Sequence, residues 1–175
     1  MRELFWLFIL FVCVQRISEL IIAKRNEKWM LSQGGYETGA RHYPFIVALH
    51  ISFFISLIIE VELLHKTISS DWPLWLTLFL LTQLSRVWTL RSLGTFWNTK
   101  IIVLPGAKIV KKGPYRWVRH PNYIIVTMEF IIIPFLFQAY YTALIFTLLN
   151  AFMLTVRIAA EEQALMNATD FKKGY

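Results

Sequence analysis

Cysteine is nearly absent from this chain. Cys13 is the only one among 175 residues, and it lies inside the first apolar run. This excludes a disulfide framework and a cysteine-based metal site. No spacing of histidines and carboxylates indicates a metal centre of another kind, so we expect no metal. Glycine is scarce as well, and none of the seven glycines belongs to a Gly-rich turn that binds nucleotide phosphates.

Charged residues make up only 17% of the chain, whereas 57% of residues are apolar and 16% are aromatic. This composition indicates a membrane protein. The net charge of +7 does not indicate a nucleic-acid partner, because the basic residues lie in short loops between apolar runs, where anionic lipid is the expected neighbour. The first run has no small-residue cleavage pattern, so we expect it to remain as an anchor.

Five apolar segments predict about five transmembrane helices. They cover roughly residues 4–22, 44–64, 73–93, 123–138 and 141–158, and most approach the ~20 residues that cross a hydrocarbon core. Helices are expected because unpaired backbone groups are costly in lipid. The fold class is therefore an all-α integral membrane protein. We expect a single membrane domain, residues 1–175, with N-terminal helices in 1–84 and a catalytic, cofactor-binding region in 85–175.

Lysine and arginine are distributed unevenly between the two sides of these segments. Four lie in 23–43, seven in 91–122 and three from residue 157 onward, whereas only Arg2 and Lys66 lie in the opposite segments. By the positive-inside rule, the N-terminus is outside and the long loop and the C-terminus are cytoplasmic.

The loop at 91–122 is predicted to fold against the membrane face. Its sequence KIIVLPGAKIVKKGPY contains two β-branched runs separated by Pro105 and Gly106, which favour a type II turn and a hairpin-like excursion. Pro121 suits the first turn of the fourth helix. His120, which precedes that proline, is biased towards an extended conformation. The imidazole would then lie beside a helix N-terminus, where an anion is favoured.

Ionisable residues at membrane depth are functional candidates because they are costly there. Arg16 and Glu19 are one helical turn apart, and we expect them to pair with each other. For Arg86 and Glu129, an interhelical ion pair and a functional role are both open.

Three further residues have simpler interpretations. Glu60 and Glu62 fall at the outer end of their segment, where solvated headgroup positions explain them. His50, alone in an apolar run, is expected to be a hydrogen-bonded core histidine.

The sequence RIAAEEQAL, residues 157–165, follows the last apolar segment. Arg157 and Glu161 are four residues apart and share one helix face. They form either a solvated pair at a helix end or part of a pocket. The second interpretation follows from topology, because this segment and the corner at 113–123 both face the cytoplasm.

The sequences LGTFW…LPGAKIVKKGPYRWVRHPNY and RIAAEEQAL…F…Y resemble the isoprenylcysteine carboxyl methyltransferase family of integral membrane enzymes, in its small bacterial type. The resemblance covers roughly residues 85–175, and the N-terminal half matches only in hydropathy. It implies an S-adenosylmethionine-dependent O-methyltransferase in a bacterial cell membrane. By the family's pattern, the cofactor site contains Tyr115, Arg119, His120, Pro121, Tyr123 and Glu161 or Glu162, while Arg157 faces the methyl acceptor.

Two reaction schemes are compatible with this resemblance. A carboxylate acceptor would be held by Arg157 and would need no base, whereas a hydroxyl or enol would lose its proton to a carboxylate such as Glu161. The family commonly has glycine where this chain has Ile125, and the chain stops at Tyr175 without a basic tail.

Because of these departures from the family pattern, we expect a small lipophilic acceptor, such as a long-chain acid or an alkyl polyketide hydroxyl, instead of a prenylated protein. The alternatives are an N-methyltransferase of phospholipid amines, a non-catalytic protein that docks on lipid, and a reductase.

Overall fold

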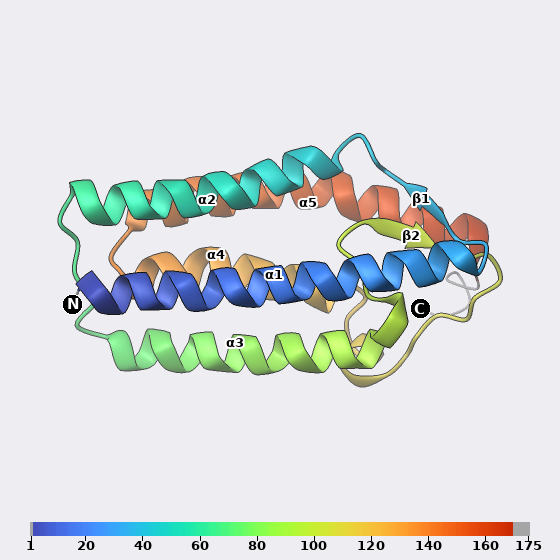
Figure 1. The fold of residues 1–175 in the computed structure, drawn as a ribbon, viewed down its shortest axis with the longest axis horizontal. Coiled ribbons are helices and arrows are strands. Elements are labelled where there is room, and N and C mark those ends of the chain that lie inside the picture. Colours follow the sequence, from blue (N-terminus) through green and yellow to red (C-terminus); the bar gives the residue numbers. More distant parts are fainter. Residues whose placement is uncertain (1, 170–175) are drawn as a thin grey trace.

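Five helices lie side by side along one long axis in the computed structural model, which describes residues 2–169 (Figure 1). They are α1 (Arg2–Ser32), α2 (Tyr43–Leu63), α3 (Trp72–Leu93), α4 (Pro121–Leu136) and α5 (Tyr140–Ala168). The predicted all-α membrane fold is confirmed. The helices α1 and α5 continue about ten residues beyond their apolar stretches, because the polar residues that follow are good helix formers.

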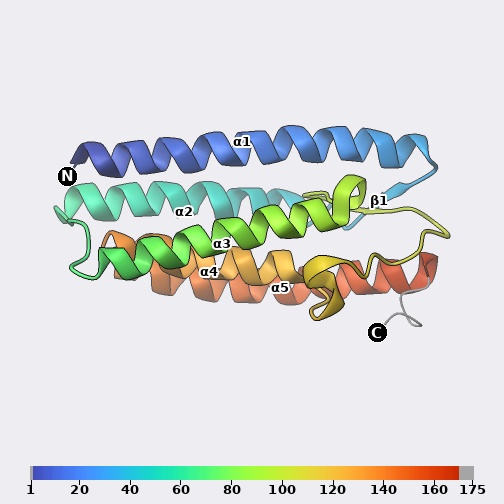
Figure 2. The ribbon, with the colours of Figure 1, turned by 90° about the horizontal axis from the view of Figure 1, so that it is seen from below.

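Three helices, α1, α2 and α5, are long and apolar enough to cross a membrane by length and composition. The apolar helix α4 has 16 residues, which corresponds to about 24 Å at 1.5 Å per residue and is shorter than a typical hydrocarbon core. The helix α3 has 22 residues and runs alongside the others (Figure 2). Helices α4 and α5 are joined by only three residues, 137–139, and pack against each other.

Prolines mark the starts of three helices. Pro44, Pro73 and Pro121 lie in the first turns of α2, α3 and α4, where the missing amide hydrogen has no helical partner to lose. The helix α3 ends at Gly94, whose φ of +58° is a conformation that glycine adopts without a steric cost. Helix boundaries in this chain thus follow local backbone chemistry as well as hydropathy.

Glu60 corrects the expectation of a solvated headgroup position, because its side chain is buried at 7% exposure. It accepts hydrogen bonds from the backbone amides of Tyr141 (3.1 Å) and Thr142 (2.7 Å) and from the Thr142 hydroxyl (2.7 Å). The first amides of a helix lack intrahelical partners and carry partial positive charge. Glu60 of α2 therefore caps α5. Glu62 instead pairs with Arg2 at 2.5 Å, at the end of the bundle where it was expected.

The core is an aromatic cluster at the end of the bundle that holds the N-terminus. The ring of Phe53 stacks on that of Phe130 with centroids 4.5 Å apart, and Phe5 meets Phe137 edge to face at 4.9 Å. Aliphatic side chains from α1, α2 and α4 complete this cluster. The packed core at this end leaves the opposite, cation-rich end of the bundle available for a site.

A two-stranded antiparallel sheet joins two loops at the cation-rich end (Figure 1). Strand β1 (Tyr36–Thr38) pairs with β2 (Ile101–Val103), with Tyr36 opposite Val103. The predicted turn at Pro105 and Gly106 is present, since Gly106 has φ +75° and the amide of Ala107 bonds the carbonyl of Leu104. However, β2 does not pair with the second β-branched run of its own loop, as the sequence predicts.

The second β-branched run of the loop at 91–122, residues 109–110, forms no strand, and β2 pairs with the loop between α1 and α2. Two short 3₁₀ helices, η1 (Gly94–Phe96) and η2 (Gly113–Arg116), flank this part of the chain. Gly113 has φ +57°, and a Cβ there would collide with Ser92. Glycine is therefore required where the chain enters η2.

Candidate functional site

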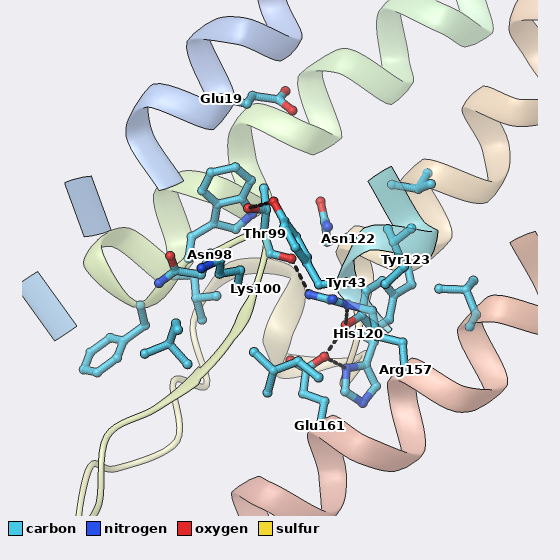
Figure 3. Close-up of a pocket in the computed structure, with 18 of the residues that line it drawn as sticks. Glu19, Tyr43, Asn98, Thr99, Lys100, His120, Asn122, Tyr123, Arg157 and Glu161 are labelled. Atoms are coloured by element: carbon cyan, nitrogen blue, oxygen red, sulfur yellow. Dashed lines mark hydrogen bonds and ion pairs between the residues drawn. The ribbon is translucent and has the colours of Figure 1, made fainter. Parts of the chain in front are cut away.

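A cavity of about 550 Å³ lies between the helices towards the cation-rich end of the bundle. All five helices and the segment around β2 contribute to its lining. Figure 3 shows Tyr123, His120, Arg157 and Glu161 grouped together in this cavity, with Glu19 of α1 at a distance from them. The cavity thus reaches from the cytoplasmic corner that the sequence predicts to charged residues within the spans.

The corner before α4 has the predicted geometry. His120 is the N-terminal cap residue, with φ −128° and ψ 63°, and Pro121 opens the helix. The imidazole stacks on the ring of Tyr123 with centroids 5.3 Å apart and planes at 21°. The side chain of His120 does not cap α4, and the amide of Tyr123 bonds the carbonyl oxygen of His120. Pro121 has no amide hydrogen, so the amide of Asn122 is the one in this first turn that suits an anion.

Tyr123 links α4 to α5 through its hydroxyl group. This hydroxyl donates a hydrogen bond to Glu161 Oε2 and accepts one from Arg157 Nε at 2.9 Å. Arg157 also donates from Nη2 to the carbonyl oxygen of Thr99 at 2.5 Å. A buried arginine is therefore fixed in position by both an aromatic side chain and the loop before β2, and Nη1 is left without a partner among residues 2–169.

The two adjacent glutamates of α5 have different surroundings. Glu161 lines the cavity, whereas Glu162 does not. Glu162 Oε1 lies 3.1 Å from His120 Nε2 and 3.5 Å from Arg119 Nη1. His120 Nδ1 is 3.8 Å from Glu161 Oε2. Glu162 thus orients the imidazole from outside the cavity, while Glu161 faces any molecule that the cavity holds.

Most of the residues that the sequence predicts for the site lie around this one cavity. The lining includes Tyr115, Arg119, His120, Tyr123, Arg157 and Glu161. Pro121 and Glu162 are outside it, and both act on the geometry of His120. The assignment of these residues to cofactor binding or catalysis stays a prediction.

Sequence reasoning missed several polar residues of the lining. Tyr43 lies 3.3 Å from Thr99, between their hydroxyl oxygens, and both line the cavity. Asn122 and Trp97 also line the cavity, and their buried atoms Asn122 Oδ1 and Trp97 Nε1 have no hydrogen-bond partner in the described part of the chain. Asn122 is inside the quoted motif, but nothing in the sequence shows that its oxygen is left unpaired. Unpaired buried polar atoms cost free energy unless a ligand satisfies them.

Two titratable groups at the cation-rich end have shifted pKa values. Lys100 lies 2.9 Å from Glu27 and 3.0 Å from Glu37, and these hydrogen bonds raise the pKa of its ammonium group. Because Glu27 is in α1 and Glu37 is in β1, Lys100 connects these two elements at the rim of the cavity. The pKa of His42 is lowered, mainly by burial of its side chain and also by the charge of Arg157.

Four charged residues form a buried network at membrane depth. Arg16 pairs with Glu19 at 2.7 Å, as predicted, and also with Glu129 at 2.5 Å. Arg86 contacts Glu129 and lies 3.2 Å from Glu19. The interhelical ion pair expected for Arg86 and Glu129 is therefore present, within a larger cluster that joins α1, α3 and α4. Arg16, Glu19 and Arg86 also line the deeper part of the cavity.

His50 has the hydrogen bond expected of a core histidine, from Nδ1 to the carbonyl oxygen of Ile46 at 2.8 Å. It also lines the cavity, which the sequence did not indicate.

Residues 75–167 match the isoprenylcysteine carboxyl methyltransferase (ICMT) family. The chain is 49% identical over 162 residues to YpbQ, an uncharacterised protein of Bacillus subtilis (strain 168), an alignment that covers 93% of this chain and 96% of that protein. It is 29% identical over 160 residues to an uncharacterised protein of Haemophilus influenzae (strain ATCC 51907 / DSM 11121 / KW20 / Rd), covering 90% and 93% of the two chains. No solved structure matches the chain.

Proposed function

Because the chain belongs to the isoprenylcysteine carboxyl methyltransferase family and is a membrane methyltransferase, we propose that it moves a methyl group from S-adenosylmethionine to an oxygen atom of a small lipophilic acceptor. One observation carries this proposal: the contacts among Tyr123, Arg157 and Glu161 lie at one end of a cavity that is otherwise largely apolar. A water-soluble methyl donor needs a polar region and a lipid-soluble acceptor needs an apolar one, and this cavity has both.

The residues at the cytoplasmic corner fit the cofactor. Its carboxylate suits the amide of Asn122 at the start of α4 and the imidazole of His120. Its cationic groups suit the negative charge of Glu161, which lines the cavity. When bound, S-adenosylmethionine supplies a methyl group that is activated by the attached sulfonium.

We place the route of the acceptor from the bilayer between α1 and α2. Ile17 and Leu20 of α1 and Val47 and Ile51 of α2 line the cavity, yet 58%, 50%, 38% and 56% of their respective areas are exposed. In a membrane the outer part of this exposed area faces lipid, and we infer that acyl chains enter the cavity between α1 and α2. An alkyl tail can remain in the hydrocarbon while the polar end reaches Arg157.

We favour a hydroxyl acceptor because Glu161 can act as its base. Arg157 donates through Nε and through one of the two Nη2 hydrogens, so its three remaining N–H groups can orient the polar end of either kind of acceptor. The Glu161 carboxylate can take the proton of a hydroxyl as the new C–O bond forms and the C–S bond breaks. Alignment of the two reactants accounts for most of the remaining catalysis.

We infer that the cation-rich end of the bundle faces the cytoplasm. The loops at 23–43 and 91–122 and the described part of the C-terminal region meet at this end (Figure 1). The positive-inside rule supports this orientation, and a cytoplasmic cofactor would then reach His120 without crossing lipid.

A labelled-cofactor assay tests the proposal. Purified protein in detergent or nanodiscs is given radiolabelled S-adenosylmethionine with a long-chain phenol, a long-chain fatty acid or phosphatidylethanolamine. We expect label in the phenol as a methyl ether. Label in phosphatidylethanolamine instead would show an amine methyltransferase and would contradict the oxygen acceptor.

Cofactor binding provides the second measurement. Calorimetric titration with S-adenosylmethionine should show binding to the wild type and at least tenfold weaker binding to His120→Ala, as expected for loss of one or more hydrogen bonds to a charged group. His65→Ala, at the opposite end of the bundle, is the matched control. Equal affinity in the wild type and His120→Ala would overturn the proposed cofactor site.

A further inference from the structure

The deeper part of the cavity contains a polar side chain that the proposed reaction does not use. Asn150 of α5 lies two helical turns from Arg157, about 10 Å along the helix axis, and lines the same cavity. The residue is only 2% exposed. A polar side chain at this depth in a membrane span is costly, and it is retained where it has a partner.

The orientation of the Asn150 amide follows from its neighbour. Thr127 donates its single hydroxyl proton to the backbone oxygen of Tyr123 at 2.9 Å, so this hydroxyl can only accept from Asn150 Nδ2, which is 3.0 Å away. The amide is thus fixed with Nδ2 towards Thr127. Asn150 Oδ1 is left as a hydrogen-bond acceptor that no residue in 2–169 satisfies.

His50 of α2 presents a second acceptor to the cavity. Its Nδ1 is 2.8 Å from the carbonyl oxygen of Ile46, and because a carbonyl only accepts, Nδ1 carries the hydrogen. The two glutamates nearby, Glu19 and Glu129, are already paired with two arginines, so no carboxylate is left to balance a cationic imidazole. In the neutral ring Nε2 is then an acceptor, and it has no hydrogen-bond partner in the described chain.

These two side chains define the chemistry of a ligand group. Each unsatisfied acceptor calls for a donor, and the neighbouring network of two arginines and two glutamates has no net charge to balance an ion. A neutral donor fits both conditions, and a hydroxyl group, which donates one proton to one acceptor, is the simplest one. We propose that the methyl acceptor carries a second hydroxyl group, about 5–10 Å or one to two helical turns from the methylated oxygen, and that it donates its proton to Asn150 Oδ1 in the part of the cavity that His50 also lines. This inference rests on the proposed function.

Matched acceptors test the inference. A long-chain phenol with one ring hydroxyl is compared with the resorcinol of the same chain length, and a long-chain fatty acid with one that carries a mid-chain hydroxyl. In at least one pair we expect the wild type to prefer the acceptor with the additional hydroxyl by about tenfold in kcat/KM, as for one buried hydrogen bond. Asn150→Leu should remove this preference and retain cofactor binding.

Thr147→Val is the matched control variant. Thr147 is on the same helix, one turn from Asn150, and its buried hydroxyl oxygen also has no partner among the described residues, but it does not line the cavity. The control should keep the wild-type preference. Equal use of both members of both pairs by the wild type, or an unchanged preference in Asn150→Leu, would overturn the inference.

A binding measurement separates failure of this inference from failure of the proposed function. The melting temperature is recorded with S-adenosylhomocysteine and each acceptor. A larger shift with the dihydroxy member, lost in Asn150→Leu, supports the second-hydroxyl site even if no methyl group is transferred, and the absence of transfer would then count against the proposed reaction alone. Equal shifts in both pairs would contradict the inference.

Discussion

Arg157 donates a hydrogen bond from Nε to the hydroxyl of Tyr123 across 2.9 Å, and that hydroxyl donates in turn to Glu161. The tyrosine is thus placed between a cation and an anion that lie one turn apart on α5. Without it, the arginine and the glutamate would be free to pair directly with each other.

Tyr123→Phe should lower kcat/KM by about tenfold or more, because Arg157 Nε loses a buried partner and Glu161 loses a donor that positions it. Substrate turnover and cofactor affinity should be measured together. Tyr140→Phe, at the opposite end of the bundle, is the control. Unchanged turnover in Tyr123→Phe would show that the hydroxyl does not position the reacting groups.

Glu161→Gln and Glu162→Gln should differ although they are adjacent. Removal of a general base costs about 10²- to 10⁴-fold in rate, and we expect this loss in kcat for Glu161→Gln with a hydroxyl acceptor. Glu162 contacts His120 from outside the cavity, so Glu162→Gln should mainly weaken cofactor binding. Steady-state kinetics with both substrates varied distinguishes the two. Equal losses of kcat would contradict the assignment of the base to Glu161.

The ion pair between Arg86 and Glu129 should show strong coupling. Replacement of either residue alone leaves an uncompensated buried charge, which typically costs about 3–5 kcal/mol, whereas the double replacement Arg86→Met with Glu129→Met should cost less than the sum. Arg16 and Glu19 remain in contact with each other in the double variant. Reversible unfolding in mixed micelles gives the coupling free energy. Additive effects would show that the pair is not energetically connected.

Glu60→Gln should destabilise the fold by about 1–3 kcal/mol, the range for a buried hydrogen-bonding group that loses its partner. The effect arises at the start of α5, where three donors converge on this carboxylate. Glu62→Gln is the natural comparison, because Glu62 pairs with a largely exposed arginine and such pairs contribute little. Melting temperatures in detergent should rank Glu60→Gln below Glu62→Gln, and the reverse order would refute the capping role.

His42 gives the stability a dependence on acid. Its lowered pKa in the folded chain means that the unfolded chain binds a proton first as pH falls through about 6.5. Protonation therefore favours unfolding, and stability present above this pH is lost below it. We expect the melting temperature to fall less in His42→Gln than in the wild type between pH about 7.5 and about 5. The control is His65→Asn, on an exposed loop at the other end of the bundle, whose melting temperature should fall as much as that of the wild type. An equal fall in all three proteins would show that His42 is not the cause.

Hydropathy and proline positions were sufficient to predict most of the fold. The five helices begin close to the expected residues because Pro44, Pro73 and Pro121 are local signals that need no tertiary context. The partner of β2 could not be predicted, since a three-residue strand carries almost no register information of its own. The cap formed by Glu60 could not be predicted either, because it joins residues more than 80 positions apart.

The candidate site was predicted in part. The spacing of Arg157 and Glu161 and the corner at His120 identify one end of the cavity, because each depends on neighbours in the sequence. Asn150 was not distinguished from an ordinary polar residue in a helix, and its significance depends on which bond Thr127 has already made. Whether a polar atom lacks a hydrogen-bond partner depends on how the folded chain packs, and a sequence pattern does not show this.

The strand pairing between residues 36–38 and 101–103 also bears on how the protein is made. Ile101 and Val103 pack on Ala164 of α5, and Gly106 bonds the carbonyl of Ala168 at 2.8 Å. This side of the cavity therefore needs the loop between α1 and α2, the loop between α3 and α4, and α5, which leave the ribosome at different times. A nascent chain that lacks α5 cannot complete this side of the cavity, so we expect ligand binding to begin only after α5 has been synthesised and inserted.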